Sequence, residues 1–80
     1  MKHWKEIDAE NNIFAEKLGF SIDSDGKSFS SYMKNEIRVW NSALWIRADL
    51  VNGSFCNHTK YETLKDALMG ENATLSLIHI

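Results

Sequence analysis

The 80-residue sequence has one cysteine, no long apolar run and no excess of basic side chains. The single cysteine, Cys56, excludes an internal disulfide framework and is typical of a reducing compartment, so we expect a cytoplasmic protein. No apolar stretch approaches the roughly 18 residues of a membrane span, and the N-terminal residues lack the apolar core of a signal peptide. The formal net charge of −2 gives no basic field that would draw nucleic acid or a membrane to the whole surface.

What the sequence does have is the composition of a small globular domain. Apolar residues make up 44% of the chain and charged residues 25%, an ordinary mixture for a folded protein. A chain this short buries only about 60% of the surface that its unfolded form exposes, so its margin of stability is small. We expect a single domain over residues 1–74.

The last six residues, 75–80, form a separate tail. Their sequence, LSLIHI, resembles a sequencing-library adapter translated in frame. Such a scar is excluded from fold reasoning, and the natural chain would then continue differently beyond Thr74. The alternative is a genuine apolar strand at a sheet edge, because Leu75, Leu77 and Ile78 are apolar. We favour the adapter and assign no function to His79.

Two segments have helical periodicity. The first repeats every three or four residues, at Trp4, Ile7, Asn11, Phe14 and Leu18. Asp8 is its candidate N-cap, with a start near His3 as the alternative, and Gly19 stands where a left-handed C-cap belongs. The second follows the capping-box spacing of residues 59–62 and has an apolar stripe at Leu64, Ala67 and Leu68. Gly70 either ends this helix or weakens it.

Strand patterns fill the middle of the chain. Aromatic and β-branched residues bounded by turn signals predict strands near residues 20–22, 29–33, 36–40, 43–51 and 54–58. Asn52-Gly53 is typical of a type I′ turn, which needs positive φ at both central residues. Three or four of these strands would form an antiparallel meander with both helices on one face. The predicted fold class is α+β.

The strand register follows from the turn between the two strongest strands. If Asn41-Ser42 is a two-residue turn, Trp40 lies opposite Ala43. One face then holds only apolar side chains, namely Ile37, Val39, Leu44, Ile46, Ala48, Leu50 and Phe55. The other face pairs Lys34 with Asp49, Glu36 with Arg47 and Arg38 with Trp45. The agreement of all these pairs favours this register.

An exposed outer face is the candidate functional site that this register predicts. It would display Arg38, Trp40, Trp45 and Arg47, and we assign these four residues to partner binding. Tryptophan and arginine are preferred anchors of protein interfaces, and the same pair stacks on bases and contacts phosphates. The alternative is structural: the N-terminal helix, a further segment of chain or a second copy covers these side chains.

A stretch of about 34 residues, 36–69, resembles known DNA-binding modules. It combines the strand Trp45-Ile46-Arg47, the turn Asn52-Gly53 and the helix entry Tyr61-Glu62-Thr63. The resemblance is to the ethylene-response-factor domain and to the arm-binding domains of tyrosine integrases, in which three strands pack on one helix. It implies that Arg38, Trp40, Trp45 and Arg47 would face the DNA major groove. Glu36 and Asp49 depart from this pattern because they place acidic groups on the same face.

Catalytic and metal-binding motifs are weak. Cys56 and His58 lie two apart, so on a regular strand they would share a face, but zinc needs four ligands and catalysis needs an orienting third group. Asp23-Ser24-Asp25-Gly26 resembles part of a calcium loop, yet Tyr32 stands where the bidentate glutamate would be required. We therefore expect no enzyme, no metal and no cofactor.

The sequence predicts a small non-enzymatic binding protein that docks a partner protein through its open sheet face. The alternative is a DNA- or RNA-binding module that uses the same face. A homodimer through this face and a phage or mobile-element origin are further expectations, and we expect no membrane partner.

Overall fold

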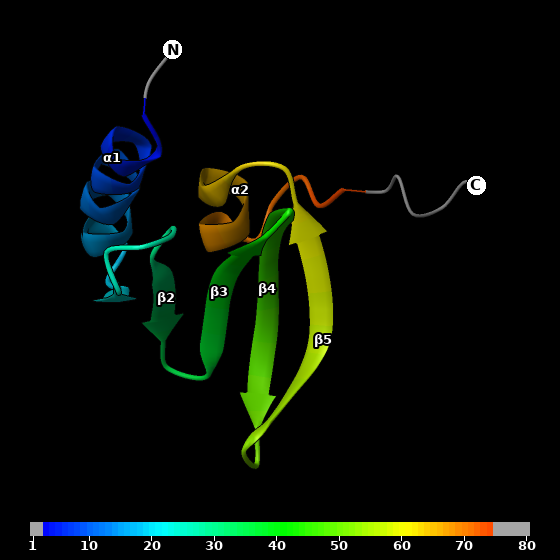
Figure 1. Cartoon of the computed structure of the whole chain (residues 1–80). Coiled ribbons are helices and arrows are strands. Elements are labelled where there is room, and N and C mark those ends of the chain that lie inside the picture. The colour runs from blue at the N-terminus through cyan, green and yellow to red at the C-terminus, as the bar shows by residue number, and fades with distance from the viewer. Residues whose placement is uncertain (1–2, 75–80) are drawn as a thin grey trace.

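The computed structural model describes residues 3–74, which form two helices and a five-stranded antiparallel sheet (Figure 1). The elements are α1 (Trp4–Lys17), β1 (Ser21–Asp23), β2 (Ser31–Lys34), β3 (Ile37–Ser42), β4 (Leu44–Val51), β5 (Ser54–Tyr61) and α2 (Leu64–Met69). The strands lie side by side in chain order, so the sheet is a simple meander. The α+β class and the order helix, meander, helix are confirmed. The meander has five strands instead of the predicted three or four.

Both helices pack on one side of the sheet, which we call the covered face. Its side chains include Tyr32, Val39, Trp45, Arg47 and Tyr61, which the strand registers place on the same side. The core between sheet and helices consists of Ala15, Phe20, Tyr32, Val39, Trp45, Tyr61, Leu64, Ala67 and Leu68. Because α1 and α2 also contact each other, the helices form one layer over this face.

Helix α1 begins earlier than its candidate cap predicted. His3 is the N-cap and forms a capping box with Glu6, whose side chain accepts a hydrogen bond from the His3 backbone. Asp8 is instead buried in the second turn, where its two carboxylate oxygens accept hydrogen bonds of 2.8 Å from the backbone N–H and the hydroxyl of Ser30. Asp8 therefore fixes the helix to the residue that precedes β2, which satisfies a carboxylate that would otherwise be costly to bury.

The end of α1 confirms its predicted C-cap. Gly19 has φ of +89°, and its N–H donates to the carbonyl of Glu16 while the N–H of Phe20 donates to the carbonyl of Ala15. This pair of bonds is the Schellman arrangement that a glycine permits. Phe20 turns into the core directly afterwards.

Helix α2 begins four residues later than the capping-box pattern predicted. Thr59 and Tyr61 belong to β5, and Thr63 is the N-cap, with its hydroxyl accepting a hydrogen bond from the N–H of Asp66. Strand pairing with β4 outcompetes the local capping signal because it satisfies both backbone and core contacts. The predicted apolar stripe of this helix is buried, and Gly70 ends it at φ of +72°.

The predicted register of β3 and β4 is wrong. Trp40 lies opposite Ile46 instead of Ala43, and Val39 lies opposite Arg47. The turn is centred on Ala43, which has φ of +67°, and not on Asn41-Ser42. This slip of three residues is an odd number, so it reverses which side chains of β3 and β4 share a face. The gain is burial of Trp45, whose ring contacts those of Phe29 and Tyr32 in the core.

Strand β5 begins after the predicted type I′ turn and contains a β-bulge. Asn52 and Gly53 have φ of +52° and +81°, which confirms the turn. Farther along, Asp49 pairs with Cys56 but Arg47 pairs with Thr59, so β5 holds one extra residue, with Asn57 at φ of +58°. The bulge separates Cys56 from His58, and the expectation that these two side chains share a face is wrong.

Candidate functional site

The structure divides the four predicted site residues between the two faces. Arg38 and Trp40 lie on the side of the sheet away from the helices, whereas Trp45 and Arg47 lie on the covered face. Trp45 is only 7% exposed and belongs to the core, so it is unavailable to a partner. The prediction of one surface made of all four residues is therefore wrong. Its cause is the register slip at Ala43.

Arg47 has a structural role at the end of α2. One guanidinium nitrogen, Nη1, donates hydrogen bonds to the carbonyl of Ala67 at 2.7 Å and to that of Leu68 at 2.9 Å. These carbonyls lie in the last turn of the helix, where a cation also meets the negative end of the helix dipole. Arg47 thus ties α2 to β4, and its charge is engaged within the fold.

The uncovered side of the sheet, which we call the open face, is the candidate functional site. Along β2 to β5 it carries Met33, Arg38, Trp40, Leu44, Ile46, Ala48, Leu50, Phe55, His58 and Lys60, and beside them Ser21, Asp23 and Ser31. Within residues 3–74, no helix or strand packs over these side chains. Most of them are apolar, so a large part of this face is poorly suited to water.

An aromatic cluster occupies the middle of the open face. The Trp40 ring lies 5.3 Å from the Phe55 ring at 48° and 5.9 Å from the His58 ring at 86°. Trp40 stands on β3 and its two partners on β5, so the indole reaches across β4. Ala48 lies on β4 in this gap and is only 1% exposed, although no helix covers it. A small residue here leaves room for the indole to contact side chains of β5 across β4.

The cluster is continued by exposed apolar side chains. Phe55 is 51% exposed and Met33 is 41% exposed. Trp40, Ile46 and Leu50 are partly exposed between them. The sequence pattern predicts Ile46, Leu50 and Phe55 in the core, because their alternation is as regular as that of a buried face, and this prediction is wrong. The sequence signal that could have placed them on the open face is Trp45. If this bulky side chain is buried, the alternate residues of the same strand point to the opposite face.

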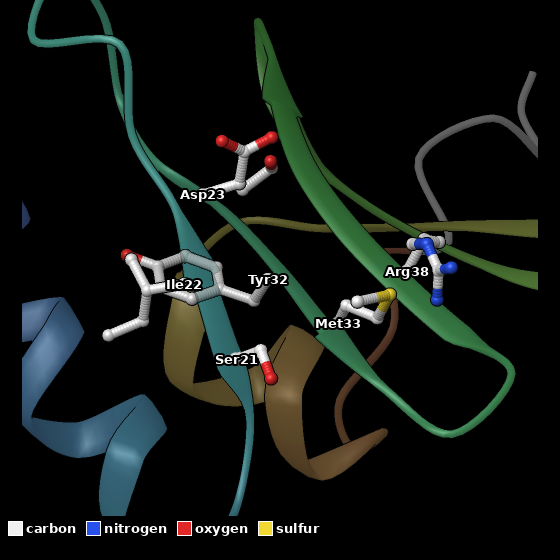
Figure 2. Close-up of a pocket in the computed structure, with 7 residues that line it drawn as sticks. Ser21, Ile22, Asp23, Tyr32, Met33 and Arg38 are labelled. Carbon is white, nitrogen blue, oxygen red and sulfur yellow. The ribbon is translucent and has the colours of Figure 1, made fainter.

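A shallow hollow of about 140 Å³ marks the part of the open face nearest β1. Figure 2 shows Asp23 at one end of it and Met33 and Arg38 at the other, while Ile22 projects toward α1. The Arg38 guanidinium donates to the carbonyls of Asn35 and Ile37 at 3.4 and 3.3 Å. These contacts hold the cation beside the β2–β3 turn. The hollow is too small and too open to enclose a substrate.

Other kinds of site have little support among the described residues. In residues 3–74, no three His, Cys, Asp or Glu side chains gather as metal ligands would. Neither α1 nor α2 has the length and apolar character of a membrane-spanning helix. Comparison with protein-family models, curated proteins and solved structures finds no match.

Proposed function

We propose that this chain is a small non-enzymatic binding protein whose open face docks a protein. The observation that carries the proposal is the aromatic cluster of Trp40, Phe55 and His58 on a sheet face that no described helix covers. Partly exposed aromatic side chains surrounded by aliphatic ones supply most of the energy in protein interfaces. A protein ligand would remove this apolar surface from water.

The charges on the open face favour a protein over nucleic acid. Arg47 lies on the covered face, where the carbonyls of α2 engage it, so the permanent charges of the open face are the cations Arg38 and Lys60 and the anion Asp23. Binding to a nucleic-acid backbone depends on many such cations, because each neutralises a phosphate. The open face has too few of them for that mode, whereas an apolar centre with scattered charges suits a protein interface.

Site-specific photo-crosslinking tests the proposal. The photoreactive residue p-benzoylphenylalanine would replace Phe55, which is 51% exposed on the open face, in cells of the organism that encodes the chain. The matched control is the same replacement at Ile13, which is 57% exposed on α1. We expect polypeptide adducts at position 55 that are absent at position 13 and are lost when Trp40→Ala is added.

Two results would overturn the proposal. One is equal crosslinking at both positions, because the open face would then have no preference for a protein. The other is binding of duplex or single-stranded oligonucleotides by the purified chain that Arg38→Gln abolishes and that falls steeply as salt is raised. That second result would establish nucleic acid as the ligand.

A further inference from the structure

One row of side chains crosses the open face from edge to edge. The registers align Asp23 on β1 with Ser31 on β2, and Trp40 on β3 with Ile46 on β4 and Lys60 on β5. Tyr32 on β2 pairs with Val39 on β3, and this register places Ser31 beside Trp40. The row therefore has a carboxylate at one end, an indole in the middle and an ammonium group at the other end. Figure 1 shows β2, β3, β4 and β5 side by side in this order.

The two charges at the ends of the row are exposed and have no charged or hydrogen-bonded partner among the described residues. Asp23 and Lys60 have exposed side chains, and neither makes a hydrogen bond or ion pair through its side chain within residues 3–74. They stand on the two outermost strands of the sheet, two strands away from β3 on either side. At about 4.8 Å between strands, each charge lies roughly 10 Å from the central strand.

This arrangement is self-complementary under a two-fold rotation. An axis that runs along β3 reverses the strand order, so β1 of one copy faces β5 of the other and β3 faces β3. Asp23 then faces Lys60 of the second copy, Lys60 faces Asp23 of the second copy, and the two Trp40 indoles meet on the axis. We infer that the ligand of the open face is a second copy of this chain, bound sheet to sheet in this orientation. The inference rests on the proposed function of the face as a protein-docking surface.

The charges also select between the two symmetric ways of stacking the sheets. With the axis across the strands, β1 would face β1 and Asp23 would approach Asp23 of the second copy, while Lys60 would approach its own equivalent. Arg38 on β3 would approach its own equivalent in the proposed orientation, which therefore has two opposite-charge pairs against one like-charge pair. The alternative has two like-charge pairs and no opposite-charge pair, so the charges disfavour it. Stacked sheets cross at about 30°, which displaces the terminal charges by about 5 Å at this distance from the axis. The flexible stem of lysine can span that offset.

The size of the face is sufficient for a weak, reversible dimer. Five strands at about 4.8 Å and an eight-residue β4 at about 3.4 Å per residue define roughly 500 Å² on each copy. Two copies would bury about 1,000 Å² in all, the lower end of specific protein interfaces. The interface would therefore be sensitive to the loss of a few contacts.

Charge reversal at the two ends of the row tests the inference. Asp23→Lys gives a chain with two cations at the row ends, and Lys60→Asp gives a chain with two anions. Sedimentation velocity would measure association from about 5 to 500 µM, a range that covers weak dimers. We expect the wild type to shift from its monomer mass of 9.2 kDa toward twice that value. Each variant alone should dimerise about tenfold more weakly, because two ion pairs become two repulsions.

Mixing the two variants makes the test decisive. An equimolar mixture of Asp23→Lys and Lys60→Asp should form a heterodimer with at least wild-type affinity, because both row ends then pair opposite charges. Glu16→Lys on α1 and Lys27→Asp in the β1–β2 loop are the matched controls, since they make the same charge changes at exposed positions away from the open face. Neither control should alter dimerisation.

An independent measurement uses the unmodified chain. In NMR spectra recorded over the same concentrations, the indole N–H of Trp40 should shift while that of the buried Trp45 stays constant. A wild type that remains monomeric, single variants that dimerise like the wild type, or a mixture that fails to recover affinity would each overturn the inference. Crosslinks from position 55 to a different protein would still support the proposed function, so the two failures are distinguishable.

Discussion

The two faces of the sheet divide polar and apolar side chains in an unexpected way. The covered face holds Arg47 beneath α2, and α1 brings the buried carboxylate of Asp8 to the same layer. The open face exposes the aromatic cluster and several aliphatic side chains. Each buried polar group has partners, and no buried side-chain nitrogen or oxygen among the described residues lacks one. An apolar pattern therefore identifies one face of the sheet, but it does not identify which face the helices cover.

The largest difference in stability between changes on the two faces should come from replacing the tryptophan on each face. Trp45→Ala removes a core side chain and should cost about 3–5 kcal/mol, most of the stability of a domain this small. Trp40→Ala should cost only about 1–2 kcal/mol, because the indole is partly exposed and loses one ring contact each with Phe55 and His58. Urea denaturation followed by circular dichroism would measure both. Equal costs would contradict the assignment of the two rings to different environments.

The next largest difference in the free energy of unfolding should be between replacements of Arg47 and of Arg38. Arg47→Met removes both hydrogen bonds to the α2 carbonyls and should lower the free energy of unfolding by about 2 kcal/mol. Arg38→Met is the control on the open face and should cost about 0.5 kcal/mol or less, since its two carbonyl contacts are longer. The same denaturation experiment applies. A larger loss for Arg38→Met would show that the open face contributes more to stability than its contacts indicate.

Alkaline pH should lower the stability of the fold through Tyr32, which lies on the covered face. Burial is the main reason that the pKa of Tyr32 is raised above its usual value of 10.0, and the charge of Asp8 adds to it. The folded state therefore favours the neutral phenol, so this contribution to stability is complete below pH 10 and is lost as the pH rises further. Tyr32→Phe should cost about 1 kcal/mol at neutral pH through the lost 2.7 Å hydrogen bond to Asn12.

The measurement is the urea midpoint at neutral pH and at about pH 10.5, where the phenol of an unfolded chain ionises. The midpoint of Tyr32→Phe should fall less between these two pH values than that of the wild type. An identical fall would mean that Tyr32 does not contribute to the alkaline loss.

The smallest expected effect is at the turn between β3 and β4, which determines which side chains of these strands lie on each face. Ala43 has φ of +67°, a conformation that is unfavourable for a residue with a Cβ atom. Ala43→Gly should therefore stabilise the fold by about 0.5–1 kcal/mol, net of the extra freedom of glycine in the unfolded chain. Ala9→Gly is the control, because Ala9 lies within α1 and glycine should destabilise there by about 1 kcal/mol. Thermal unfolding would show opposite shifts in Tm.

Local signals in the sequence were sufficient for much of the fold. Gly19 and Asn52-Gly53 predicted a helix end and a turn correctly, because both depend on positive φ, which few residues adopt. The apolar stripe of α2 was equally clear. The start of α2 was wrong because residues 59–62 satisfy a capping pattern and a strand pattern at once, and pairing with β4 decides between them.

The candidate site depended on a long-range choice that local signals do not make. Asn41-Ser42 is a better turn sequence than Ala43, so turn chemistry favoured the wrong register. The observed register is stabilised by the burial of Trp45 against Phe29 and Tyr32, which are distant in sequence. Arg38 and Trp40 were placed on the open face by either register. Trp45 and Arg47 were placed there only by the wrong one.

The bulge at Asn57 sets a limit on how far this sheet can extend. A straight strand that paired along the outer edge of β5 would fall out of step at the extra residue, and the carbonyl of Lys60 already accepts a hydrogen bond from Thr74. Growth by addition of further strands is therefore blocked at this edge. The exposed apolar surface of the open face is therefore bounded on the β5 side by an edge that resists the strand addition on which amyloid growth depends.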